Sequence, residues 1–128
     1  MRTAGMFAEL GRVKQDEPQP SITDHVLASP LPDADRVVAY LRAGHRLLDF
    51  MDISDDVFDP SRQVLGGPSV LTDGDWMWRD DLAYYVEWHQ VTPPPELLEL
   101  IRRRHYIMPI VADDVLDALV EPAVRLMS

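Results

Sequence analysis

The chain has 128 residues, no cysteine and a formal net charge of −10, with 46% hydrophobic and 8% aromatic residues. This length and hydrophobic content are typical of one globular domain, and the missing cysteines exclude disulfides, thiolate metal sites and cysteine nucleophiles. The negative charge argues against binding to nucleic acid or to an anionic membrane, because both need a cationic surface. No apolar run approaches the roughly 18 residues of a membrane span, and the start lacks a secretory pattern, so we expect a cytoplasmic protein.

The first segment is predicted to be peripheral. Residues 1–20 are interpreted as a tail or linker, because "GRVKQDEPQP" at 11–20 combines two prolines with few apolar residues. Within it, Met6, Phe7 and Leu10 are expected to form at most one docked turn. Residues 21–128 are then a single globular domain. It begins with a short helix over 21–28, capped by the hydroxyl of Ser21.

The clearest helical pattern follows at residues 32–50, "PDADRVVAYLRAGHRLLDF". Apolar residues recur at helical spacing from Val37 to Leu48 and predict one buried stripe. Gly44 lies inside this stripe and weakens a helix by about 1 kcal/mol relative to alanine. It indicates either close packing against a neighbour or an early end of the helix.

An acidic segment overlaps the end of this pattern. Five aspartates lie between residues 49 and 59, and no basic residue occurs there before Arg62. The interleaved apolar residues must anchor the segment, since long irregular loops are uncommon in compact domains. Gly66, Gly67 and Pro68 predict a turn at its end.

Residues 69–78, "SVLTDGDWMW", predict a β-hairpin. Asp-Gly between two β-prone runs is a strong signal for a type I′ turn, in which Asp73 and Gly74 are the central residues. Val70 would then face Met77, and Trp76 and Trp78 would share the opposite face of the strand from Met77.

Three further helices are expected. Asp80 is placed to cap the helix of "LAYYVEWHQ" (82–90), and a proline run at 93–95 starts the next one, which ends near Arg102–Arg104. The last covers 112–120, and Pro122 kinks or ends it. The predicted fold is therefore α+β and mainly helical, with four or five helices packed around one short β-hairpin at about 69–78.

The candidate chemistry is sparse. The carboxylates of Asp73, Asp75, Asp80 and Asp81 have turn or capping roles that explain their residue types. Neither acidic stretch has the glycine and glutamate spacing of a calcium loop, and the four histidines lack the spacing of a helical zinc motif, so we expect no metal site and no cofactor. His89, beside the aromatic cluster, is the one histidine that we interpret as a possible functional group.

The acidic segment is the best candidate for contact with another protein. It is either a solvated loop or an acidic face that meets an Arg/Lys-rich partner, with aromatic anchors inside it. The candidate partner-binding residues are Asp49, Asp52, Asp55, Asp56, Asp59, Phe50 and Phe58.

Residues 72–101, "TDGDWMWRDDLAYYVEWHQVTPPPELLELI", carry a resemblance. The pattern T-D-G-x-W-x-W, then L-x-Y-Y-V, then P-x-E-x-L resembles small bacterial proteins similar to the immunity partners of polymorphic toxins. "RVVAYLRAGHRLLDF" also matches their preceding helix. The resemblance implies a protein that binds and neutralises a cognate toxin, and it specifies no catalytic residue.

Three functional hypotheses follow. The first is a non-enzymatic acidic binding module, an immunity or inhibitor protein that masks a basic partner surface. The second is a small-molecule or metal-dependent enzyme that uses His89 with Asp75, Asp80 or Glu87, which requires these groups to converge in a pocket. The third is a structural subunit of a bacterial assembly. The partner's identity and the oligomeric state stay open at this point.

Overall fold

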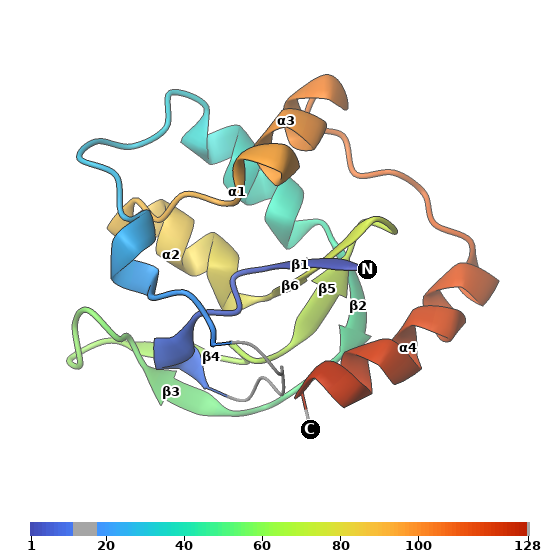
Figure 1. The fold of residues 1–128 in the computed structure, drawn as a ribbon, viewed down its shortest axis with the longest axis horizontal. Coiled ribbons are helices and arrows are strands. Elements are labelled where there is room, and N and C mark those ends of the chain that lie inside the picture. Colours follow the sequence, from blue (N-terminus) through green and yellow to red (C-terminus); the bar gives the residue numbers. More distant parts are fainter. Residues whose placement is uncertain (12–17, 128) are drawn as a thin grey trace.

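The computed structural model, which describes residues 1–11 and 18–127, has an α+β fold with two β-structures (Figure 1). A four-stranded mixed sheet has the order β1-β6-β5-β2, and β3 and β4 form a separate hairpin. The strands are β1 (Arg2–Ala4), β2 (His45–Leu48), β3 (Ile53–Asp55), β4 (Gln63–Leu65), β5 (Val70–Thr72) and β6 (Trp76–Arg79). The helices are α1 (Ala34–Arg42), α2 (Asp81–His89), α3 (Pro95–Arg103) and α4 (Asp113–Met127), with short 3₁₀ helices η1 (Ala8–Leu10) and η2 (Ile22–His25). The predicted α+β class is confirmed, but the predicted single hairpin is only half of a larger sheet.

The sheet separates two hydrophobic cores. Helices α1, α2 and α3 pack on one face, where Trp76 and Trp78 lie in the larger core. Helix α4 covers the other face, where Met77 lies in the smaller core. The two indoles therefore share a face opposite Met77, as the alternation of a strand requires.

The N-terminal segment is part of the fold, so the predicted peripheral tail is wrong for its described residues. β1 pairs in parallel with β6, and Ala4, Met6 and Phe7 are buried. Glu9 then accepts hydrogen bonds from the Ser21 hydroxyl (2.5 Å) and the Ile22 amide (2.9 Å). The predicted capping by Ser21 is confirmed at the start of η2, where its hydroxyl accepts from the Thr23 amide (3.3 Å). Residues 12–17 of the predicted linker lie outside the described residues.

The helix predicted over 32–50 ends at Arg42, and its second half is the strand β2. Gly44 explains the change, because a Cβ there would lie 2.7 Å from the Trp78 ring and 2.9 Å from the Leu71 Cβ. Only glycine lets the chain pass so close to the sheet. Residues 45–48 then pair antiparallel with β5, and this pairing overrides their helical pattern.

The β5–β6 hairpin exists, but its register differs from the predicted one by two residues. Val70 faces Arg79 instead of Met77, and the turn is centred on Gly74 and Asp75. The cause is Asp73, whose carboxylate accepts from the amides of Asp75 (2.9 Å) and Trp76 (2.8 Å) and so lies before the turn. Gly74 has a φ of +96°, whereas Asp75 has no positive φ, so the turn is not type I′.

Helix α2 starts without the predicted side-chain cap. Asp80 makes no capping hydrogen bond and instead accepts from Arg46 (3.3 Å). The next residue, Asp81, is buried and forms a two-pronged ion pair with buried Arg79 (3.1 and 2.9 Å). Burial raises the pKa of Asp81 to about 6, although Arg79 lowers it. Its neighbourhood is tight, because a Cβ on Gly67 would lie 2.7 Å from the Asp81 carboxylate.

Helix α3 ends at Arg103, as predicted. Arg102 and Arg104 also bind carboxylates of distant elements: Arg102 donates to Asp33 (2.9 Å) and Arg104 to Asp73 (3.0 Å). Helix α4 continues through Pro122 to Met127. Proline removes one internal hydrogen bond, but the residues beyond it include buried Ala123 and Met127, whose packing offsets that loss.

Candidate functional site

The acidic segment, residues 49–59, contains strand β3 and the first part of the loop 56–62, which connects β3 to β4 in a two-stranded hairpin. The register pairs Ile53 with Leu65, Ser54 with Val64 and Asp55 with Gln63. Val64 is buried, whereas Ile53 and Leu65 are each 63% exposed. Because residues two apart on a strand share a face, Ile53, Asp55, Gln63 and Leu65 form one outward face of the hairpin. The middle of the acidic segment is therefore a strand, and the residues on either side of it are loops.

Asp56 joins the loop to helix α2. One carboxylate oxygen accepts from the amides of Phe58 (2.8 Å) and Asp59 (3.2 Å). The other accepts from the Tyr84 hydroxyl (2.6 Å) and from Nε2 of His89 (2.5 Å). Burial by itself would raise the pKa of Asp56, but the hydrogen bonds from Tyr84 and His89 outweigh it and hold the pKa below its ordinary value. The buried carboxylate is thus kept charged by four donors.

Aromatic rings surround the hydrogen bond between Asp56 and His89. Phe58 packs against the His89 ring at 4.7 Å between centroids and edge-on against Tyr85 at 6.0 Å. The Tyr85 hydroxyl accepts from the Val57 amide (3.1 Å). Arg62 lies over the Trp88 ring at 3.9 Å, a cation–π contact. The loop therefore packs on the last turn of α2 through aromatic rings and the hydrogen bonds of one buried carboxylate.

The predicted partner-binding residues differ in their exposure to solvent. Asp49 and Asp55 are exposed and Asp52 and Asp59 are half-buried, so these four are partly or fully accessible. Asp56 is buried, and its predicted role on a binding face is wrong because its carboxylate is enclosed by its donors. Among the aromatic anchors, Phe58 is partly exposed and packs on α2, while half-buried Phe50 packs against the smaller core.

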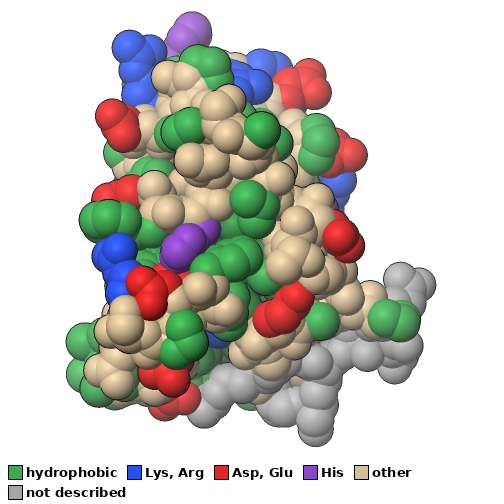
Figure 2. All heavy atoms as spheres, turned by 90° about the vertical axis from the view of Figure 1, so that its left-hand side faces the viewer, with side chains coloured by type: hydrophobic (Ala, Val, Ile, Leu, Met, Phe, Trp, Pro, Cys, Tyr) green, Lys and Arg blue, Asp and Glu red, His purple; other side chains and the backbone are tan. Residues whose placement is uncertain are grey.

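Sequence reasoning missed four exposed hydrophobic residues of this region. Met51 is 78% exposed, Trp88 is 51% exposed, and Ile53 and Leu65 are described above. Figure 2 looks onto the side of the molecule at the left of Figure 1, where hydrophobic side chains lie beside acidic ones. Asp59-Pro60-Ser61 between two short β-prone runs is the turn signal that could have predicted the hairpin and its outward face.

The carboxylates proposed to act with His89 have other partners. Asp75 pairs with Arg104, Asp80 with Arg46 (3.3 Å) and Glu87 with Arg42 (2.7 Å).

His89 instead pairs with Asp56. In enzymes, a carboxylate that is hydrogen-bonded to a histidine also orients the imidazole to act as a base. In the described part of the chain, no serine or threonine hydroxyl is hydrogen-bonded to His89. The pair's visible role is to hold the loop on α2.

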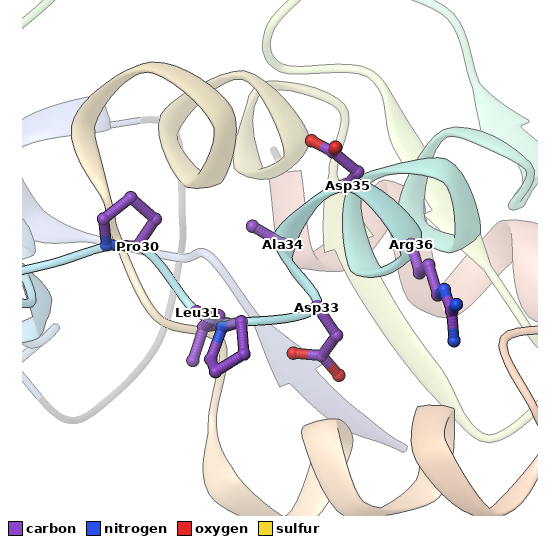
Figure 3. Close-up of a pocket in the computed structure, with 7 residues that line it drawn as sticks. Pro30, Leu31, Asp33, Ala34, Asp35 and Arg36 are labelled. Carbon is purple, nitrogen blue, oxygen red and sulfur yellow. The ribbon is translucent and has the colours of Figure 1, made fainter.

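A hollow of about 540 Å³ lies where the chain enters α1 (Figure 3). Its polar side chains do not converge, because Asp35 points away from Asp33. Asp33 is already engaged by Arg102 and by the Tyr106 hydroxyl (2.7 Å). The hydrogen bond from Arg102 lowers the pKa of Asp33 to about 2. This hollow is therefore bordered by structural contacts and carries no evident chemistry.

No group of three or more His, Asp or Glu side chains in residues 1–11 and 18–127 is arranged to hold a metal ion. No helix in the same ranges is long and apolar enough to cross a membrane.

Comparisons with protein-family models, with curated proteins and with solved structures return no match to this chain. The resemblance of residues 72–101 to immunity proteins therefore stays a prediction.

Proposed function

We propose that this protein is a binding module for a basic protein, and that it acts as an immunity or inhibitor protein by masking the partner's surface. The observation that carries the proposal is the outward face of the β3–β4 hairpin, where exposed Ile53 and Leu65 lie beside the carboxylate of Asp55. Hydrophobic side chains supply most of the affinity of an interface when they are buried on binding. Acidic groups around them accelerate encounter with a basic partner and select against acidic ones.

The charge of the whole chain supports the same partner. A net charge of −10 attracts a basic protein over long range and repels nucleic acid. The resemblance of residues 72–101 to toxin-neutralising proteins implies that the partner is a toxin. A basic toxin would agree with the electrostatic argument. Asp49 and Asp55 are exposed and Asp52 and Asp59 are half-buried, so these four acids are accessible to a partner, whereas Asp56 is not.

Binding to proteins encoded next to this gene tests the proposal. Each candidate is expressed with and without this chain, and purified pairs are titrated by calorimetry at about 50 and 500 mM NaCl. We expect a basic protein whose toxicity is relieved on co-expression and whose affinity falls as salt rises. Absence of any such partner, or binding that salt leaves unchanged, contradicts the proposal.

A charge-matched pair of variants locates the surface. Changing Asp49, Asp52, Asp55 and Asp59 to asparagine removes four negative charges at the hairpin. Changing the exposed acids of α4 to their amides removes the same charge elsewhere. That control set is Asp113, Asp114, Asp117 and Glu121. We expect the hairpin variant to slow association about tenfold or more and the α4 variant to have a much smaller effect. If both variants slow association equally, the interface does not lie at the hairpin.

A further inference from the structure

We propose that the partner is bound by strand addition: an extended segment of the basic protein pairs with the free edge of β3 as a third strand of the hairpin. This inference rests on the proposed function, and it specifies how and where that function is carried out.

Among the described residues, the outward backbone groups of β3 have no hydrogen-bond partner at this edge. Hydrogen bonds join the Asp56 amide to the Arg62 carbonyl (2.9 Å) and the Gly66 amide to the Asp52 carbonyl (2.7 Å). In antiparallel pairs, hydrogen-bonded and non-hydrogen-bonded positions alternate, so Ser54 bonds to Val64 while Ile53 and Asp55 do not bond across the hairpin. The N–H and C=O groups of Ile53 and Asp55 therefore point away from β4.

No other described element covers this edge. All three residues of β3 are exposed, and none of the hydrogen bonds described above reaches the outward groups of Ile53 or Asp55. The edge strand β2 of the larger sheet differs, because α4 packs against it. A free edge of this kind is a ready template for an added strand.

The side chains decide which strand fits. Ile53 and Asp55 share a face, so an incoming strand meets a hydrophobic position and an acidic position two residues apart. A segment with a hydrophobic residue and a lysine or arginine at the same spacing would match both. A second copy of this chain would instead bring Asp52 and Asp55 beside like charges, which is unfavourable. The occupant is therefore a basic, extended segment of another protein.

Amide hydrogen exchange by NMR tests the pairing in the complex of this protein with the basic partner. The amides of Ile53 and Asp55 should become at least about tenfold slower on binding, because they acquire acceptors. Ser54 is the internal control, since its amide already bonds within the hairpin. A complex in which Ile53 and Asp55 exchange as fast as in the free protein overturns strand addition and leaves the proposed function intact. Failure to form any complex instead counts against the proposed function.

Two substitutions at one position provide an independent test. Ile53→Pro removes the outward N–H without removing a hydrogen bond of the hairpin, whereas Ile53→Ala shortens the side chain and keeps that N–H. We expect the proline variant to bind about tenfold or more weakly than the alanine variant, with similar urea midpoints for both free proteins. Equal affinities would contradict a backbone role. Light scattering reports self-association through β3, which would also contradict the proposal.

Discussion

Two neighbouring aspartates in the acidic segment have opposite environments. Asp55 is exposed on the outward face of the hairpin, while Asp56 is buried and accepts four hydrogen bonds from the loop and α2. A charge in that position is stable only because its donors replace water. The same residue type is therefore buried for folding at one position and, in the function that we propose, exposed for recognition at its neighbour.

Asp56→Asn should destabilise the protein by about 1–3 kcal/mol, because an amide turns an NH₂ group toward a donor and loses the charge-assisted hydrogen bonds. Asp55→Asn is the matched control and should change the free energy of unfolding by less than about 0.5 kcal/mol. Urea unfolding at pH 7 measures both variants. Equal stabilities would show that the buried carboxylate contributes nothing.

The stability difference between the wild type and Asp56→Asn should depend on pH with a defined sign. The pKa of Asp56 is lowered in the folded protein from 3.8, so its charged form stabilises the fold above that pH. The stability gap between the wild type and Asp56→Asn should therefore narrow as the pH falls below about 3.8 and the carboxylate becomes protonated.

At the scale of elements, the junction between α1 and β2 shows how tertiary contacts override a local pattern. Residues 45–48 continue the helical spacing of α1, yet they pair with β5. The chain leaves the helix at Ala43 and passes the sheet at Gly44, where a side chain would meet Trp78 and Leu71. The strand is therefore specified by its partner and by one glycine.

Gly44→Ala should lower the free energy of unfolding by about 1–3 kcal/mol, because the new methyl group must push the Trp78 ring and the Leu71 side chain aside. Ala43→Ser, at the exposed neighbouring position, should stay within about 0.5 kcal/mol of the wild type. Thermal and urea denaturation provide the measurement. If Gly44→Ala leaves the free energy of unfolding unchanged, the close approach of residue 44 to Trp78 and Leu71 does not require glycine.

At the scale of the whole molecule, one thin sheet joins two cores. Trp78 and Met77 are adjacent on β6 and belong to different cores, and β1 carries the N-terminus into the same sheet. Loss of packing on one face is therefore transmitted to the other through shared strands. The molecule is expected to unfold as one cooperative unit.

Met127→Ala, in the smaller core, should cost about 2–4 kcal/mol and shift two probes equally. Those probes are the fluorescence of the buried tryptophans, which lie in the larger core, and the far-ultraviolet circular dichroism. Coincident urea midpoints in wild type and variant are expected. A variant in which helix α4 melts first, before the tryptophan signal changes, would show that the cores are independent.

Local patterns in the sequence determined the α+β class, the start of α1, the existence of the β5–β6 hairpin and the shared face of Trp76 and Trp78. These features depend on helical spacing, strand alternation and turn residues within about ten positions. The side-chain alternation also survived the two-residue error in register, because a shift of two keeps each residue on its face.

The tertiary structure decided the features whose partners are distant in the chain. β1 is a strand because it pairs with β6 more than seventy residues later, and β2 is a strand because it pairs with β5. Asp56 became a buried group because Tyr84 and His89 reach it from α2. Such contacts are stabilised only when the whole chain is folded, so no short stretch of sequence records them.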